Sequence, residues 1–137
     1  MAQTVTIYCA SSKKTPSRFL QAAEELALHL LEHKITVRYG GGALGLMGKI
    51  ADVYIQHSGS IQGVIPEFMV NVEWAHPFVK EMHIVRDMHE RKQGLINNTD
   101  AVIALPGGTG TLEELMEVLA LKRLGKFLKP IIILNTE

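Results

Sequence analysis

The sequence predicts an α/β fold of the Rossmann-like type, in which a doubly wound, mostly parallel sheet carries helices on both faces. Two observations support this prediction. Short β-branched or apolar runs alternate along the chain with stretches whose apolar residues recur at helical spacing, a pattern typical of βαβ units. Glycine-rich turns at Gly40–Gly42 and Gly107–Gly110 each follow such a run and open the next helical stretch.

The first half of the chain predicts three strands and two helices. Pro16 suits the first turn of a helix, and Pro66 is expected to stop a strand because proline cannot donate to a sheet. The expected strands are Val5–Ala10, Ile35–Tyr39 and Ser60–Ile65, and the helices start at Pro16 and cover Leu46–His57.

The second half begins with Glu67–Val79, which lacks a clear period and is interpreted as a loop or short helix over the strand ends. Ala101–Leu105 is a continuous apolar run, as expected in the middle of a parallel sheet. Leu112, Leu115, Met116 and Leu119 are expected on the apolar side of the last helix. The remaining elements are a strand at His83–Val85, helices at Met88–Asn97 and Thr111–Leu124, and a strand at Pro130–Leu134.

Length and composition indicate one globular domain covering residues 1–137. Fourteen basic and fourteen acidic side chains cancel, so neither nucleic acid nor an anionic membrane is an expected partner. Apolar runs stay well below the roughly 20 residues of a membrane span. Cys9 is the only cysteine, and it is interpreted as a buried structural thiol in a cytoplasmic protein.

The second glycine cluster carries the strongest functional signal. Glycine lets a ligand approach the backbone closely, and a following helix offers unpaired N–H groups and a positive dipole end to an anion. Thr109 and Thr111 add hydroxyl donors, and Thr111 also suits a helix cap. A plain strand–helix connection is the alternative for either cluster alone, but two clusters in one small domain favour a phosphate site.

The kind of nucleotide is narrowed by what the glycine clusters lack. No Gly-Lys-Ser/Thr follows either cluster, which argues against a Walker loop. The first cluster lacks the dinucleotide spacing, and no acidic residue ends the second strand to hold a ribose. A mononucleotide is therefore the expected ligand.

Two further segments bring charged groups towards the strand ends. Arg91, near the start of a predicted helix, suits two-pronged binding of phosphate or ribose oxygens, although a solvated helix face is the alternative. Glu114 lies one turn into the helix behind the second glycine loop, where compensation of the helix dipole is the other explanation. The six histidines form no evident ligand cluster, so no metal is expected.

Three strings carry a resemblance to a known family. GGGALGLMG, MHERK and PGGTGTLEE occur in this order and resemble the LONELY GUY family of cytokinin riboside 5′-monophosphate phosphoribohydrolases, whose hallmark is PGGxGTxxE. TIYCASS, GSIQGVIPEFM and LNTE extend the similarity over most of the chain. Family members are often labelled lysine decarboxylases, but that reaction requires pyridoxal phosphate on a lysine, and the sequence offers no evident site.

The resemblance implies hydrolysis of the N-glycosidic bond of AMP or an N6-modified AMP, giving free base and ribose 5-phosphate without a cofactor. It assigns Arg91 and Glu114 as the catalytic pair and Met88 to the base. A homodimer is also implied, and the family's C-terminal end is expected to be missing. The implied phosphate and ribose contacts are Ser12, Gly41, Gly42, Lys92, Gly107, Gly108, Thr109, Gly110 and Thr111.

The residue types suit this chemistry, because cleavage of a glycosidic bond builds positive charge on the ribose. A carboxylate such as Glu114 stabilises that charge or orients water. Plant-like members carry tryptophan and glutamine where this chain has Leu121 and Arg123, which leaves the preferred base open. The alternatives are a non-catalytic carrier of a nucleotide or of molybdenum cofactor, which needs no Arg91–Glu114 pair, and an AMP sensor.

Overall fold

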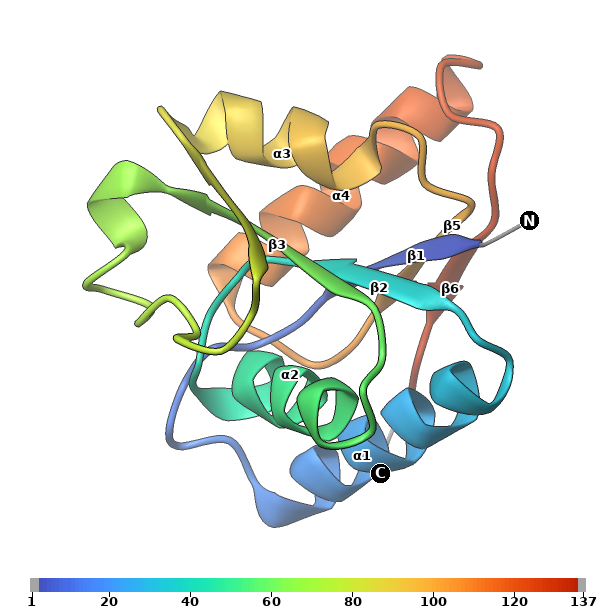
Figure 1. The fold of residues 1–137 in the computed structure, drawn as a ribbon. Coiled ribbons are helices and arrows are strands. Elements are labelled where there is room, and N and C mark those ends of the chain that lie inside the picture. Colours follow the sequence, from blue (N-terminus) through green and yellow to red (C-terminus); the bar gives the residue numbers. More distant parts are fainter. Residues whose placement is uncertain (1–2, 136–137) are drawn as a thin grey trace.

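The centre of the molecule is a six-stranded, all-parallel sheet, seen in a computed structural model that describes residues 3–135 (Figure 1). Its strand order is β4-β3-β2-β1-β5-β6. The strands are β1 (Thr4–Tyr8), β2 (Thr36–Tyr39), β3 (Ile61–Pro66), β4 (Glu81–Val85), β5 (Ala101–Ala104) and β6 (Ile131–Ile133). Thr136 and Glu137, which end the string LNTE, lie outside the described residues.

Helices cover both faces of the sheet. α1 (Ser17–Glu32) and α2 (Gly45–Gln56) lie together on one face, while α3 (Met88–Ile96) and α4 (Thr109–Arg123) lie on the other (Figure 1). Each face has its own apolar core, with Tyr39 and Ile50 in the first and Leu95 and Val118 in the second. The predicted fold class is therefore confirmed.

The order of the strands reverses between β1 and β5. β1 pairs with β2 on one side and with β5 on the other, where Tyr8 lies opposite Ala104. The chain leaves β1 towards α1 on one face and leaves β5 towards α4 on the opposite face. Loops that diverge in this way leave a crevice at the carboxyl ends of the strands, where ligands bind in such sheets.

The β3–β4 connection is the irregular part of the fold. A single 3-10 turn, η1 (Glu67–Met69), is followed by turns and irregular backbone up to the start of β4. This segment passes over the carboxyl ends of the strands, as the sequence predicts for Glu67–Val79. Here it is called the crossing loop and comprises residues 67–80.

The predicted elements agree with the structure to within a residue or two. The instructive difference is α4, which begins at Thr109 after an N-cap at Gly108 and not at Thr111. Thr111 is therefore not the helix cap, and its side chain instead packs over Gly107, where a Cβ would overlap Thr111 Oγ1. Pro66, expected to stop β3, is its last residue.

The apolar side of α4 also differs from expectation. The helix buries Glu114 and Val118, whereas Leu112 and Met116 are 57% and 56% exposed. Apolar spacing alone assigned the wrong side to these two side chains, because the inward face of α4 carries the buried carboxylate of Glu114. None of the helices between residues 3 and 135 combines the length and apolar character that crossing a membrane requires.

Candidate active site

A cavity of about 400 Å³ lies at the reversal of strand order. The end of β1, the crossing loop, the start of α3 and the first turns of α4 all contribute to its wall. Its lining residues are Cys9, Ala10, Ser11, Ser12, Met47, Met69, Glu73, Met88, Arg91, Gly108, Thr109, Gly110, Thr111 and Glu114.

The N-terminus of α4 forms one end of this cavity. Gly108 is the N-cap, and no side chain caps the helix. The first N–H groups of a helix have no intrahelical partner, so Thr109, Gly110 and Thr111 present donors together with the positive end of the dipole. A Cβ added at Gly108 or Gly110 would meet nothing within 4 Å. These two glycines therefore leave open space at a helix N-terminus, where N–H groups and the helix dipole favour an anion.

Glu114 lies one turn further along α4 and is buried, with 7% of its surface exposed. Its Oε2 atom is buried without a hydrogen-bond partner among the described residues. Burial raises the pKa of the Glu114 carboxyl to about 7; Arg91 opposes this shift and the charge of Glu73 adds to it. A carboxyl that exchanges a proton near neutral pH is suited to acid–base chemistry.

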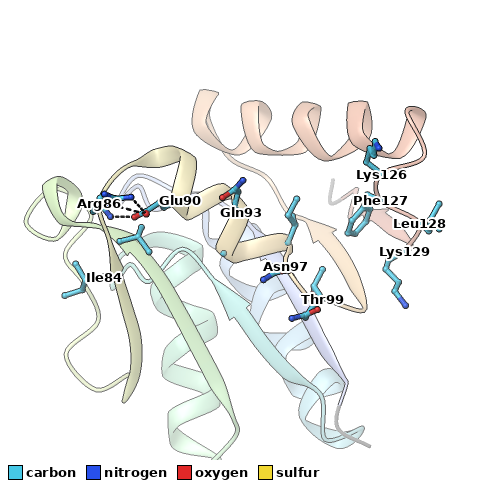
Figure 2. Close-up of a pocket in the computed structure, with 14 residues that line it drawn as sticks. Ile84, Arg86, Glu90, Gln93, Asn97, Thr99, Lys126, Phe127, Leu128 and Lys129 are labelled. Carbon is cyan, nitrogen blue, oxygen red and sulfur yellow. Dashed lines mark hydrogen bonds and ion pairs between the residues drawn. The ribbon is translucent and has the colours of Figure 1, made fainter.

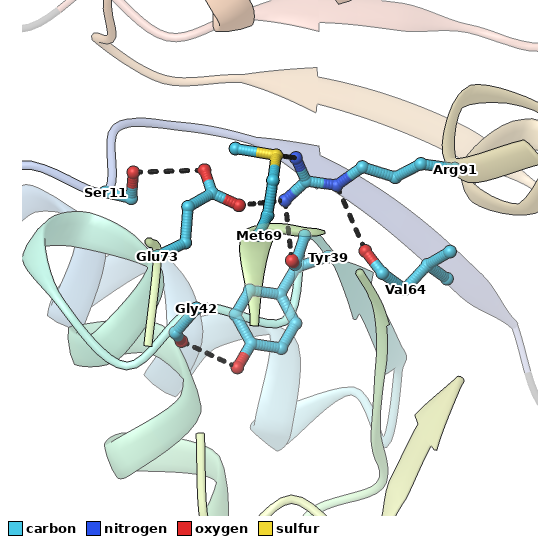
Figure 3. A network of polar contacts seen from close by, with 8 residues as sticks. Ser11, Tyr39, Gly42, Val64, Met69, Glu73 and Arg91 are labelled. Atoms are coloured by element: carbon cyan, nitrogen blue, oxygen red, sulfur yellow. Dashed lines mark hydrogen bonds and ion pairs between the residues drawn. The ribbon is translucent and has the colours of Figure 1, made fainter. Parts of the chain in front are cut away.

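Arg91 crosses from α3 towards the first glycine cluster and is 3% exposed (Figure 3). Nε donates to the carbonyl of Val64 at 3.1 Å, and Nη2 donates to the carbonyl of Gly40 at 2.6 Å. Nη2 also lies 2.7 Å from Glu73 Oε1, and Nη1 lies 3.5 Å from the sulfur of Met69. The guanidinium is thus held by backbone carbonyls and a carboxylate, with Nη1 as its least committed nitrogen.

Glu73, on the crossing loop, is a site residue that the sequence reasoning missed. Its Oε1 pairs with Arg91, and its Oε2 accepts a hydrogen bond from Ser11 Oγ at 3.2 Å (Figure 3). The cavity therefore contains two carboxylates and one guanidinium. The available signal was an acidic residue in an aperiodic segment expected over the strand ends, but no spacing rule links Glu73 to Arg91.

Most of the sequence-predicted site residues meet at this cavity. Arg91 and Glu114, proposed as a pair, both line it, as does Met88. The predicted phosphate contacts that line it are Ser12, Gly108, Thr109, Gly110 and Thr111.

Four predicted contacts are not among the described lining residues, and each has another environment. Gly41 packs against Met82 and Ile65, with a left-handed φ of +82°. Gly42 lies against Met47 and the carbonyl of Glu73, and Gly107 lies beneath Thr111. Lys92 Nζ pairs with Glu113 at 2.6 Å and Glu117 at 2.7 Å. The first glycine cluster therefore contacts Arg91 and the crossing loop and does not line the cavity itself.

Cys9 also lines the cavity, as a buried thiol. Burial is the main cause that raises the pKa of this thiol, and the nearby charge of Glu114 adds to it. A thiol held in its neutral form is a poor nucleophile, which agrees with the structural role predicted for Cys9.

A larger hollow of about 970 Å³ lies between α3 and the segment that joins α4 to β6 (Figure 2). Phe127 and Leu128 form part of its wall, and Arg86 pairs with Glu90 at 2.9 Å near its edge. None of the sequence-predicted site residues lines it. The smaller cavity is therefore the better candidate for the chemistry.

Fold and cavity together define a Rossmann-like α/β protein with an uncapped helix N-terminus and a buried carboxyl group at the strand reversal. The model of a family described as "Possible lysine decarboxylase" matches residues 47–137, and the chain belongs to this family.

Curated relatives carry a more specific name. The probable cytokinin riboside 5′-monophosphate phosphoribohydrolase LOGL9 of Oryza sativa subsp. japonica is 41% identical over 97% of this chain and 59% of its own length. The cytokinin riboside 5′-monophosphate phosphoribohydrolase of Rhodococcoides fascians is 40% identical over 97% of this chain and 68% of its own. The chain thus spans about three fifths to two thirds of these relatives.

Solved structures confirm the fold. The molybdenum cofactor binding protein of Rippkaea orientalis matches with a TM-score of 0.78 and 22% identity, over 100% of this chain and 78% of the other. The molybdenum cofactor carrier protein of Chlamydomonas reinhardtii matches with a TM-score of 0.76 and 20% identity, over 100% and 78%. At this identity the likeness concerns the fold alone.

The cavity does not suit the decarboxylase named in the family description. Amino-acid decarboxylation through pyridoxal phosphate needs a lysine for the Schiff base. The lining residues of the cavity, all within the described part of the chain, include no lysine. Lys92, close by on α3, is instead engaged by Glu113 and Glu117.

Proposed function

We propose that this chain hydrolyses the N-glycosidic bond of AMP or an N6-modified AMP, such as a cytokinin riboside 5′-monophosphate, to free base and ribose 5-phosphate. The observation that carries the proposal is the unpaired, buried Oε2 of Glu114 in the same cavity as the uncapped N-terminus of α4. The names of the curated relatives support the same reaction.

In this proposal the N-terminus of α4 and Glu114 have separate roles. The phosphate lies on the N–H groups of Thr109, Gly110 and Thr111, which places the ribose towards Glu114. Water attacks C1′ while the C1′–N9 bond breaks and the base leaves with a proton. With a pKa near 7, Glu114 is able either to give that proton to the base or, when ionised, to stabilise the positive ribose.

Base release is the direct test. The chain is incubated separately with AMP and N6-isopentenyladenosine monophosphate, and free base and ribose 5-phosphate are measured by chromatography. We expect both products in equal amounts, and their loss in Glu114→Gln, which keeps the shape of the side chain. Tight AMP binding with no base released by the unchanged chain would favour a nucleotide carrier.

We also propose that the chain pairs with a second copy through α4. Leu112 and Met116 are more than half exposed on this helix, and exposed apolar side chains in a row favour an interface. Light scattering is expected to give twice the mass of one chain. The double variant Leu112→Glu with Met116→Glu is expected to give the mass of one chain.

A cytoplasmic location is also proposed, from the single free cysteine, with cell fractionation as its test.

A further inference from the structure

Glu73 has contacts that the proposed reaction does not yet use. Its carboxylate joins Ser11, after β1, to Arg91, on α3. The side chains of Glu73 and Arg91 are only 11% and 4% exposed. Building on the proposed function, we propose that Glu73 is a positioning residue that fixes the guanidinium of Arg91 beside Glu114 and sets the charge of the cavity.

The backbone around Glu73 is anchored on both sides. Its N–H donates to the carbonyl of Met69 at 2.8 Å, and its own carbonyl accepts from the N–H of Ala43 at 3.4 Å. Three residues on, the N–H of His76 donates to the carbonyl of Gly41 at 2.9 Å, next to the bridge between Gly42 and Ala75. The first glycine cluster therefore holds the crossing loop and places Glu73 at the cavity.

The side chain of His76 adds a third anchor. Its ring is buried, and Nε2 lies 2.7 Å from Asp52 Oδ1 on α2. The N–H of Phe78 donates to Nδ1 at 3.2 Å, so Nδ1 acts as the acceptor and Nε2 carries the proton towards Asp52. A segment held by two backbone contacts and a buried imidazole presents Glu73 in one orientation.

Most hydrogen-bond donors of the Arg91 guanidinium are already occupied, one of them by the carboxylate of Glu73. Nε and both hydrogens of Nη2 are used by Val64, Gly40 and Glu73. Two-pronged phosphate binding by Arg91 therefore competes with Glu73, and the cation is offered to the cavity mainly through Nη1. A buried cation without a partner is strongly disfavoured, so Glu73 keeps Arg91 in place.

Glu73 also acts on Glu114 through charge. Its carboxylate raises the pKa of Glu114, whereas Arg91 lowers it. The other titratable groups around Glu114 are Tyr8 and Cys9 on the β1 side, Lys92 on α3, and Glu113 and Glu117 on α4. Removal of the Glu73 charge is therefore expected to lower the pKa of Glu114, because the opposing effect of Arg91 remains.

The test compares Glu73→Gln with Glu67→Gln, an exposed carboxylate on the same loop, as the matched control. The pH dependence of kcat/KM for base release is measured with both. In Glu73→Gln we expect the limb governed by Glu114 to move to lower pH by about one unit. The direction is the same whether the reaction needs Glu114 protonated or ionised. Glu67→Gln should superimpose on the unchanged chain.

A second readout separates this proposal from the proposed function. The Glu114 carboxyl is titrated by carbon NMR, with its signal assigned by its disappearance in Glu114→Gln. Even a chain that releases no base should show the Glu114 signal titrating about one unit lower in Glu73→Gln. An unchanged titration in a folded Glu73→Gln protein would overturn the positioning role.

A conservative variant covers the case in which Glu73→Gln does not fold. Glu73→Asp retains the negative charge but withdraws it from Arg91 by one methylene. We expect kcat to fall about tenfold or more from the lost alignment, while the Glu114 titration stays near that of the unchanged chain. Full activity of Glu73→Asp would count against the proposal.

Discussion

Gly40 lies directly against Arg91: its carbonyl accepts a hydrogen bond from Nη2 at 2.6 Å, and a Cβ on Gly40 would overlap that same nitrogen. The first glycine cluster therefore serves a buried cation of the protein itself. Glycine at position 40 is explained by the close approach of the guanidinium to the backbone.

Gly40→Ala is predicted to displace Arg91 and to lower both stability and activity. The added methyl group has no free space, since the terminal methyl group of Met47 also lies against this position. Overpacking of this kind costs about 1–3 kcal/mol. Urea denaturation measures the loss, and an unchanged midpoint with full base release would contradict the packing described here.

Gly110→Ala is predicted to have the opposite effect on stability. The Cβ meets nothing within 4 Å, and the residue lies in the first turn of α4. Alanine in a helix is favoured over glycine by about 0.5–1 kcal/mol, so the midpoint should stay constant or rise. Calorimetric affinity for ribose 5-phosphate should fall at least tenfold, because the methyl group enters the phosphate space. Undiminished affinity would place the phosphate elsewhere.

Glu114 is predicted to make stability depend on pH. Its pKa is raised from 4.5 to about 7 by folding, so the folded state keeps a proton that the unfolded state loses. This stabilisation is complete below about pH 4.5, falls as the pH rises, and is gone above about pH 7. The loss is on the order of 3 kcal/mol. Denaturation at pH 5 and pH 8 should show a smaller difference for Glu114→Gln, and equal differences would argue against the raised pKa.

His76→Ala is predicted to loosen the crossing loop. The substitution leaves the N–H of Phe78 without its acceptor and Asp52 without its donor. Loss of such buried contacts costs about 1–3 kcal/mol. Hydrogen exchange of amides in residues 70–79 should accelerate, whereas His33→Ala, at an exposed imidazole, should leave those amides unchanged. Equal exchange in both variants would remove His76 as an anchor.

The fold was accessible from the sequence because its local signals agree. The apolar run Ala101–Leu105 and the glycine turn after it fix a strand and a helix start, and β5 lies next to β1 as a central strand should. The second glycine loop likewise indicated an anion site, and Arg91 and Glu114 line the same cavity.

Long-range contacts were not accessible in the same way. Glu73 reaches Arg91 across 18 positions from a segment without periodicity, and no local rule links them. The environment of Lys92 escaped detection for a similar reason, since its ion pairs join α3 to α4. The inward face of α4 was obscured because a buried carboxylate breaks the apolar pattern on which helix orientation is normally judged.

The central place of β1 has a consequence for how the molecule assembles. One edge of β1 pairs with the nearby β2, but the other edge stays unpaired until β5 is in place, 96 positions away from Val5 at Ala101. Contacts this distant in sequence are slow to form. Until β5 docks, this edge of β1 is open to mispairing during folding.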